Sequence, residues 1–151
     1  MSETAQNFAN HTRIVKPFHL GVFPVLVLNF IWSAVLFITG LTAGVWSILA
    51  GLVGLLLAVA LIGMFFFTRI FALTVQDRLI RLEMHLRLRE VLPEDLKPRI
   101  GELTVGQLIA LRFASDAEMP ELMRTVLSEK IVSRSEIKKR IKDWQGDYLR
   151  V

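Results

Sequence analysis

The chain has no cysteine, which excludes disulfide bonds and metal sites built on thiolates. It also has no Asp, Glu, Lys or Arg from residue 20 to residue 67, although 21% of its 151 residues are charged. A soluble globule distributes charge over its whole surface, and a disordered chain is poor in apolar residues. The uncharged run therefore excludes both classes for this chain, in which 53% of the residues are hydrophobic.

The uncharged run has the length of two membrane-spanning helices joined by a turn. Residues 20–41 and 45–67 supply 22 and 23 uncharged residues. At about 1.5 Å per residue each helix would measure roughly 33–35 Å, more than a hydrocarbon core of about 30 Å. Since backbone groups must stay hydrogen-bonded in lipid, the chain has to fold back, and the weak point is Gly40-Leu41-Thr42-Ala43-Gly44. The sequence predicts a transmembrane hairpin and not a cleaved signal peptide, whose apolar region runs about 7–15 residues.

Basic residues flank the two open ends of this hairpin. Arg13 and Lys16 precede the first span, Arg69 and Arg78 follow the second, and the turn between the spans carries no charge. Lys and Arg are enriched in loops on the cytoplasmic side of a membrane. We therefore expect both termini to be cytoplasmic.

Small or weakly polar side chains recur at helical spacing on both spans. Such faces allow close helix packing, and a buried Asn hydrogen-bonds across them. We interpret them as packing within the hairpin, and the alternative is an interface with a second copy or with a partner protein. A pore or substrate path is disfavoured because the spans carry no charged residue. The candidate interaction residues on these faces are Asn29, Ser33, Gly51, Gly54 and Ala58.

Residues 68–92 are predicted to continue the second span as one helix, because no Gly or Pro interrupts them. Opposite charges four residues apart support this helix at Asp77–Arg81 and Glu83–Arg87. Leu79, Leu82 and Leu86 form an apolar stripe that needs cover, from a coiled-coil partner or from the C-terminal part of the chain. About two heptads are too few to argue a coiled coil alone, so we expect the chain itself to cover the stripe.

Residues 93–151 are predicted to form a compact helical domain of three short helices after a break at Pro93 and Pro98. Thr104 is expected to cap a first helix that runs to about Phe113. Capping boxes of Ser and Glu mark the starts of the other two helices, at Ser115–Glu118 and Ser133–Glu136. The last helix is expected to bury a stripe of residues spaced by four, three and four: Ile137, Ile141, Trp144 and Tyr148.

The predicted last helix carries a basic cluster, Lys138, Lys139 and Arg140. We interpret it as a solvated face near anionic lipid headgroups or a partner, where each basic residue adds about 1 kcal/mol. A DNA-recognition helix also needs base-reading side chains on one face, and only Gln145 offers itself. Nucleic acid is therefore the weaker interpretation.

No motif of an enzyme is present. The chain has no Gly-rich phosphate loop, no zincin pair of histidines and no Gly-x-Ser-x-Gly elbow. His11 and His19 are eight residues apart, which is not the spacing of a metal-binding pair on one helix face. Asp116 lies near a predicted helix start, where the helix dipole stabilises a carboxylate. We expect no catalytic site, no cofactor, no metal and no small-molecule substrate.

Several segments nevertheless look distinctive, and together they resemble an uncharacterised family of small two-span bacterial membrane proteins. The resemblance covers nearly the whole chain and implies a bacterial inner-membrane location. It implies no known activity and supplies no catalytic or ligand residues. The segments are Gln6-Asn7-Phe8-Ala9-Asn10-His11-Thr12-Arg13, Asp77-Arg78-Leu79-Ile80-Arg81-Leu82-Glu83, Leu111-Arg112-Phe113-Ala114-Ser115-Asp116, Ile141-Lys142-Asp143-Trp144-Gln145 and Tyr148-Leu149-Arg150.

The polar residues of these segments suggest a contact between distant parts of the chain. Asn and Arg side chains in this number are hard to explain as a generic solvated surface. Our hypothesis is that the N-terminal segment folds onto the C-terminal helices, with Arg13 or His11 meeting Asp116 or Asp77.

The sequence thus predicts an all-α membrane protein in four parts: residues 1–19 as a cytoplasmic or interfacial segment, 20–67 as a transmembrane hairpin, 68–92 as a helix extending into the cytoplasm, and 93–151 as a compact helical bundle. We expect a non-enzymatic accessory, scaffold or regulatory protein that acts through a protein partner or a homo-oligomer. The alternatives are a membrane-tethered nucleic-acid-binding protein and a small subunit of a transport complex.

Overall fold

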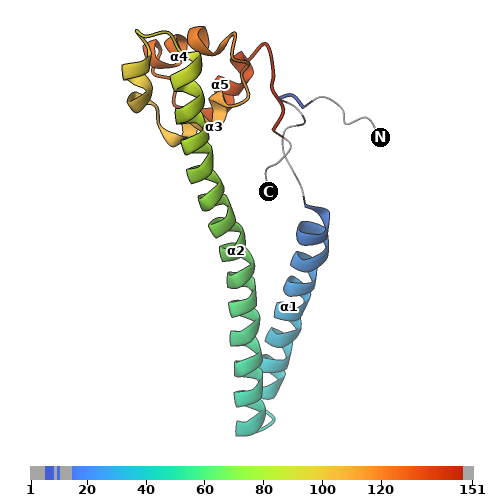
Figure 1. Cartoon of the computed structure of the whole chain (residues 1–151). Coiled ribbons are helices and arrows are strands. Elements are labelled where there is room, and N and C mark those ends of the chain that lie inside the picture. The colour runs from blue at the N-terminus through green and yellow to red at the C-terminus, as the bar shows by residue number, and fades with distance from the viewer. Residues whose placement is uncertain (1–5, 9, 11–14, 148–151) are drawn as a thin grey trace. The chain divides into compact units, whose positions relative to one another are not determined.

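The computed structural model describes residues 6–8, 10 and 15–147 (Figure 1). The chain is all-helical, with 74% of its residues in helix. The described residues contain no β-strand, and one isolated bridge joins Ala114 and Trp144. In chain order the elements are a π-helix η1 (Pro17–Val22), α1 (Phe23–Gly40), α2 (Val45–Val91), a 3-10 helix η2 (Lys97–Glu102), α3 (Val105–Leu111), α4 (Met119–Ser128) and α5 (Arg134–Arg140).

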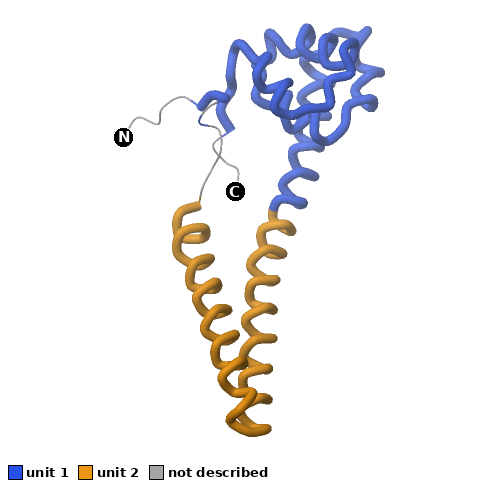
Figure 2. The backbone as a smooth tube through the Cα atoms, turned by 180° about the vertical axis from the view of Figure 1, so that it is seen from behind, with its two compact units in different colours: residues 1–12, 73–151 blue, residues 13–72 orange. Residues whose placement is uncertain are grey.

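The chain divides into two compact units (Figure 2). The apolar unit comprises residues 13–72, and the C-terminal unit comprises residues 1–12 and 73–151. Helix α2 contributes to both units without a break, as the sequence predicts for residues 68–92.

The apolar unit consists of two helices that return on each other through a tight turn. Gly44, at the end of this turn, has a φ of +105°, a conformation that favours glycine. The turn falls where the sequence predicts it. The first helix begins earlier than the predicted residue 20, because Pro17 fits a first helical turn, where a missing N–H costs little. Pro17–Gly40 and Val45–Val91 are both long and apolar enough to cross a membrane.

The small residues of the two helices face each other near the turn. A Cβ atom at Gly51 would lie 2.7 Å from the Cα of Phe37, and one at Gly40 would lie 3.0 Å from the carbonyl oxygen of Ser47. A Cβ atom at Gly54 would lie 3.9 Å from the Oγ of Ser33. The helices therefore pack so closely here that only a hydrogen atom fits at Gly51.

The remaining predicted residues of these faces differ in exposure. Ala58 is buried. Asn29 is exposed, and its Oδ1 accepts a hydrogen bond from the Ser33 hydroxyl at 3.3 Å. Farther from the turn the ring of Phe18 stacks on that of Phe65, with centroids 4.0 Å apart. The outer surface exposes large apolar side chains, including Trp32.

The core of the C-terminal unit is built on one face of α2. Ile80, Met84 and Leu88, spaced by four residues, are buried there, and Leu92, the residue after the helix, continues the series. They pack in one cluster with side chains from η2, α3, α4 and α5: Ile100, Leu108, Leu111, Met119, Met123, Val126 and Ile137.

The described part of the chain does not cover the predicted stripe of Leu79, Leu82 and Leu86. All three side chains are exposed, so this prediction was wrong. The physical reason is that a helix at the surface of a domain buries one face, and the domain took the face that begins at Ile80. That face continues past the helix end through Leu96, which is also buried.

Local capping signals were correct at two of the three predicted helix starts. Thr104 and Gln107 form a reciprocal capping box at α3, which ends at Leu111, earlier than the expected Phe113. The Ser133 hydroxyl accepts from the N–H of Glu136 at α5. At Ser115 the prediction was wrong, because α4 begins at Met119 and the Ser115 N–H bonds instead to the carbonyl of Asp143 at 3.1 Å.

The predicted last helix is shorter than its apolar spacing suggests. Helix α5 ends at Arg140, and Ile141 already has an extended backbone. Trp144 therefore lies in a bridge with Ala114 and not on a helix. Tyr148, the last residue of the predicted stripe, lies outside the described residues.

Replacing Gly51 with alanine tests the close approach of the two apolar helices. We expect Gly51→Ala to lower the free energy of unfolding of the hairpin by about 1–3 kcal/mol, because the new methyl group has to displace backbone atoms of Phe37. The measurement is an SDS titration of the purified protein in mixed micelles. Gly63→Ala is the matched control: no atom lies within 4 Å of its Cβ position, so it should be neutral or stabilising by up to about 1 kcal/mol. Equal losses in both variants would contradict the contact.

Candidate functional site

The C-terminal unit carries a groove beside α2, with a volume of about 400 Å³. One wall comes from α2, and the other comes from the residue after α3 and from the segment that follows Trp144. The lining combines apolar side chains with amides and charged groups: Gln76, Leu79, Ile80, Glu83, Met84, Arg87, Arg112, Gln145, Gly146 and Asp147.

Arg87 holds one wall of the groove in place. Its Nε donates to the carboxylate of Asp116 at 2.7 Å, its Nη1 to the carbonyl of Arg112 at 3.0 Å, and its Nη2 to the carbonyl of Ala114 at 2.7 Å. A single guanidinium thus ties α2 to the backbone after α3. Such charge-assisted bonds are about twice as strong as neutral ones. The predicted ion pair between Glu83 and Arg87 is not formed, because the Arg87 guanidinium bonds to these three acceptors instead.

A second arginine ties the end of the described chain to this wall. The Nη2 of Arg112 pairs with the Asp147 carboxylate at 3.1 Å, and the guanidinium carbon lies 4.6 Å from the centroid of the Phe113 ring. The N–H of Asp147 in turn donates to Oε1 of Gln6 at 2.8 Å. Arg112 therefore positions the segment that closes one side of the groove.

The N-terminal segment contacts the C-terminal unit through its described residues. Gln6 binds the backbone of Asp147, and the Phe8 ring lies under the Lys139 ammonium at 5.6 Å. Asn7 and Asn10 exchange side-chain-to-backbone hydrogen bonds, which form a local turn. These contacts agree in kind with the hypothesis that the two parts meet.

The ion pairs named in that hypothesis involve Arg13 and His11, which lie outside the described residues. Asp116, one of the carboxylates named, pairs with Arg87. The described residues include no ion pair of Asp77.

The chain after α5 returns to the loop after α3 and pairs with it. The Gln145 N–H donates to the carbonyl of Phe113 at 2.7 Å, and the rings of Phe113 and Trp144 stack with centroids 4.8 Å apart. One carboxylate oxygen of Glu118 accepts from the N–H groups of Lys142 and Asp143, both at 3.1 Å. This pairing places Gln145 in the groove, exposed to solvent.

The groove gathers residues from segments that carried the family resemblance. Ile80 and Glu83, Arg112, and Gln145 come from three of these segments, and Gln6 of a fourth contacts the groove residue Asp147. Sequence reasoning missed the groove itself. The sequence signal for the groove was that these segments hold many polar residues that no local structure explains. The sequence did not show which of these residues pair, because the contacts join residues about 30 or more positions apart.

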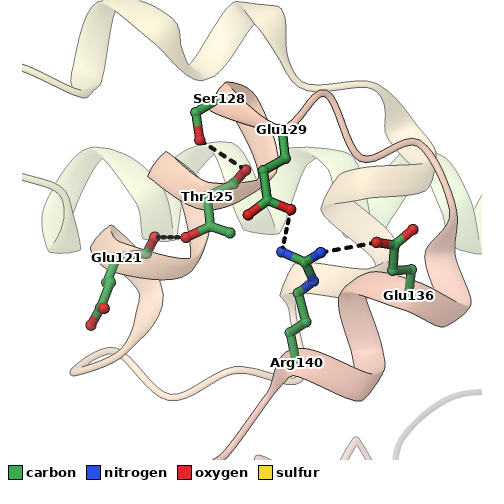
Figure 3. Close-up of polar contacts among 6 residues, drawn as sticks. All are labelled: Glu121, Thr125, Ser128, Glu129, Glu136 and Arg140. Atoms are coloured by element: carbon green, nitrogen blue, oxygen red, sulfur yellow. Dashed lines mark hydrogen bonds and ion pairs between the residues drawn. The ribbon is translucent and has the colours of Figure 1, made fainter.

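The basic cluster of α5 makes contacts within the chain. Figure 3 shows Arg140 between two carboxylates, with Nη1 2.6 Å from Glu129 and Nη2 3.0 Å from Glu136. The hydrogen bond that Arg140 donates to Glu129, together with the one that it donates to Glu136, raises the pKa of Arg140. Lys138 lies over the Phe113 ring at 4.8 Å and Lys139 lies over Phe8. Lys138, Lys139 and Arg140 thus contact side chains of the chain itself, and Lys139 is also exposed to solvent.

Another surface ion pair lies outside the groove lining. Arg124 donates to the Asp95 carboxylate at 2.9 Å and thereby lowers the pKa of Asp95. A carboxyl with a lowered pKa in the folded state stabilises the fold above its unfolded pKa and loses that contribution as the pH falls. Both side chains are more than half exposed, so the pair contributes little.

The described residues include no group of three or more His, Asp or Glu side chains placed to hold a metal ion. A second hollow of about 540 Å³ lies between α1 and α2 in the apolar unit, and no charged side chain lines it. The groove of the C-terminal unit, unlike this hollow, is lined in part by charged side chains.

Comparison with known proteins gives a family and no function. A family model described as "Family of unknown function (DUF6526)" matches residues 1–151. No curated protein and no solved structure matches the chain.

Removing the Arg87 guanidinium tests whether it organises the groove wall. We expect Arg87→Met to lower the free energy of unfolding of the C-terminal unit by about 2–4 kcal/mol, because two backbone carbonyls lose their charged donor. The measurement is urea-dependent proteolysis of the full chain in detergent. Asp116→Asn is the control: its carboxylate is 62% exposed, so it should cost less than about 1 kcal/mol. A loss in Arg87→Met no larger than in Asp116→Asn would show that the carbonyl bonds do not matter.

Proposed function

The chain belongs to this family of unknown function, DUF6526, and we propose that it is a non-enzymatic accessory or scaffold protein of the bacterial inner membrane. The observation that carries the proposal is helix α2. One unbroken helix begins in an apolar hairpin and ends as the central core helix of a polar, compact unit. Such a helix joins an anchor to a domain that presents surfaces for recognition.

Three features support membrane anchoring with both termini in the cytoplasm. The two apolar helices have the length and hydropathy of membrane spans. Their outer surfaces expose large apolar side chains that water would not favour. Basic residues lie only at the open ends of the hairpin, at Lys16, Arg69 and Arg78, while the turn is uncharged.

The groove supports a protein partner better than a phosphate-bearing one. Its two arginines are already engaged, Arg87 with Asp116 and Arg112 with Asp147. The lining then offers hydrogen-bond acceptors: the Glu83 carboxylate and the Oε1 of Gln76, which is buried and has no donor among the described residues. A polypeptide segment with amide or basic donors and small apolar side chains fits this chemistry.

The two alternative functions have weaker support. Nucleic acid binding would need free cations, whereas Lys138, Lys139 and Arg140 contact aromatic rings and carboxylates of the chain. A transport path would need polar or charged groups within the apolar helices, and residues 20–67 carry no charge.

Single cysteines test the membrane topology, because the natural chain has none. We expect a membrane-impermeant maleimide to label Ala43→Cys, in the hairpin turn, from outside intact spheroplasts. Lys130→Cys, on the surface of the C-terminal unit, should react only after permeabilisation. The readout is the mass shift of the purified protein. Labelling of Lys130→Cys in intact spheroplasts would overturn the orientation, and carbonate extraction of the chain from membranes would overturn the anchor.

Charge placed in the groove tests its role in recognition. We expect a partner that co-purifies stoichiometrically with the full chain from native membranes to be lost with Gln145→Lys. Val132→Lys is the matched control, since Val132 is 73% exposed and does not line the groove, and it should retain the partner. Retention by both variants would exclude the groove, and absence of any partner with the natural chain would remove the proposed recognition while leaving the membrane anchor standing.

A further inference from the structure

The cytoplasm-proximal part of α2 exposes an apolar stripe on the side away from its own core. Val75, Leu79, Leu82 and Leu86 are 67%, 53%, 59% and 54% exposed. They follow one another at spacings of four, three and four residues, which is the a/d pattern of a coiled coil. The adjoining face of the same helix, from Ile80 to Leu88, is buried in the C-terminal unit. The helix is therefore covered on one side and open on the other.

The charges beside the stripe select a partner. With Leu79 and Leu86 at a positions, Arg78 and His85 fall at g positions, and Glu83 and Glu90 fall at e positions. In a parallel two-stranded coiled coil, each g side chain meets the e side chain five residues farther along the other helix. The facing pair of opposite charges would be Arg78 with Glu83, made twice in a symmetric dimer, and His85 would lie beside Glu90.

An antiparallel pairing does not use these charges in the same way. With Val75 opposite Leu86, Arg78 would face His85 and Glu83 would face Gln76, so neither pair would join opposite charges. Within residues 72–90 the attraction between Arg78 and Glu83 therefore belongs to the parallel direction.

The charged residues beside the stripe make no ion pair within the described part of the chain. Among the described residues, Arg78, Glu83 and Glu90 form no ion pair, whereas nearby Arg87 is fully committed to the groove wall. The free charges lie on both flanks of the exposed stripe, where a second helix would be in contact with them.

We propose that a second copy of this chain covers the stripe, as a parallel two-stranded coiled coil along residues 72–90. The proposal rests on the proposed membrane anchoring, because two copies inserted with the same orientation present α2 in parallel. About two heptads pair weakly in free solution. Confinement to one membrane raises the effective concentration of the second helix and makes a short seam sufficient.

Cysteine cross-linking of the full chain in native membranes tests both contact and direction. We expect Val75→Cys and Leu86→Cys each to form disulfide-linked homodimers under mild oxidation, seen on non-reducing gels. Arg81→Cys is the matched control: it is exposed and adjacent to Leu82 but lies at a c position, so its dimer yield should be about tenfold lower. Equal yields at Arg81 would indicate random collision and overturn the proposal.

The two ends of the stripe distinguish the directions. In an antiparallel dimer Val75 would face the region of Leu86, and like cysteines would be separated by about 16 Å along the helix. A disulfide needs Cα atoms about 4.4–6.8 Å apart. Cross-linking of a mixture of Val75→Cys with Leu86→Cys, without self-cross-linking of either, would therefore overturn the parallel arrangement.

Charge exchange tests the specificity of the seam. In the Leu86→Cys background we expect Arg78→Glu and Glu83→Arg each to reduce the dimer yield about fivefold to tenfold, by turning attraction into repulsion. The double variant should restore it. A double variant as weak as the single ones would overturn the assigned pairs. If carbonate releases the chain from membranes, the proposed function fails as well; if the chain stays in the membrane and no cysteine of the stripe cross-links, only the dimer fails.

Discussion

Helix α2 is the constraint on which the rest of the structure depends. It runs without interruption from Val45 to Val91, so its side chains have to suit two different surroundings along one axis. In its first half the residues are apolar on all sides, which suits lipid or a fully buried helix. In its second half charged residues appear, and the face from Ile80 to Leu92 becomes the core of a compact unit.

The rotation of α2 about its own axis decides what remains exposed. Two apolar stripes run along its second half, one through Ile80, Met84 and Leu88 and the other through Leu79, Leu82 and Leu86. Helices α3, α4 and α5 cover the first stripe, and Arg87 fixes this choice by reaching three acceptors in the loop after α3. The second stripe is then left open by geometry, since a single layer of short helices does not wrap around a helix.

How far the sequence predicted the structure depends on the range of the signals. The hairpin turn at Gly40–Gly44 and the caps at Thr104 and Ser133 are local, because each partner lies within a few residues, and all three were correct. Ser115 has an equally good local signal and fails, because the segment around Asp143 competes for its backbone. The apolar periodicity of Leu79, Leu82 and Leu86 was predicted correctly, but the cover expected for this stripe was wrong. Periodicity shows that a face is apolar, and it does not show which apolar face the domain buries. Arg87 illustrates the same limit: an i,i+4 pair is worth about 0.3–0.5 kcal/mol, less than a set of charged bonds to backbone carbonyls.

Two residues connect the proposed surfaces of the C-terminal unit. Leu79 and Glu83 line the groove and also belong to the exposed side of α2 where a second copy would pack. In the proposed dimer the second helix would therefore border the groove and take up the Glu83 carboxylate that a groove partner could otherwise use. Binding in the groove and pairing of two chains then act on the same side chains. By linkage, a partner that binds more tightly to the groove of the paired form strengthens pairing, and pairing strengthens the binding of that partner by the same factor. A partner that needs a free Glu83 carboxylate weakens pairing, and pairing weakens its binding. A scaffold built in this way couples its assembly in the membrane to its occupancy without any chemical step.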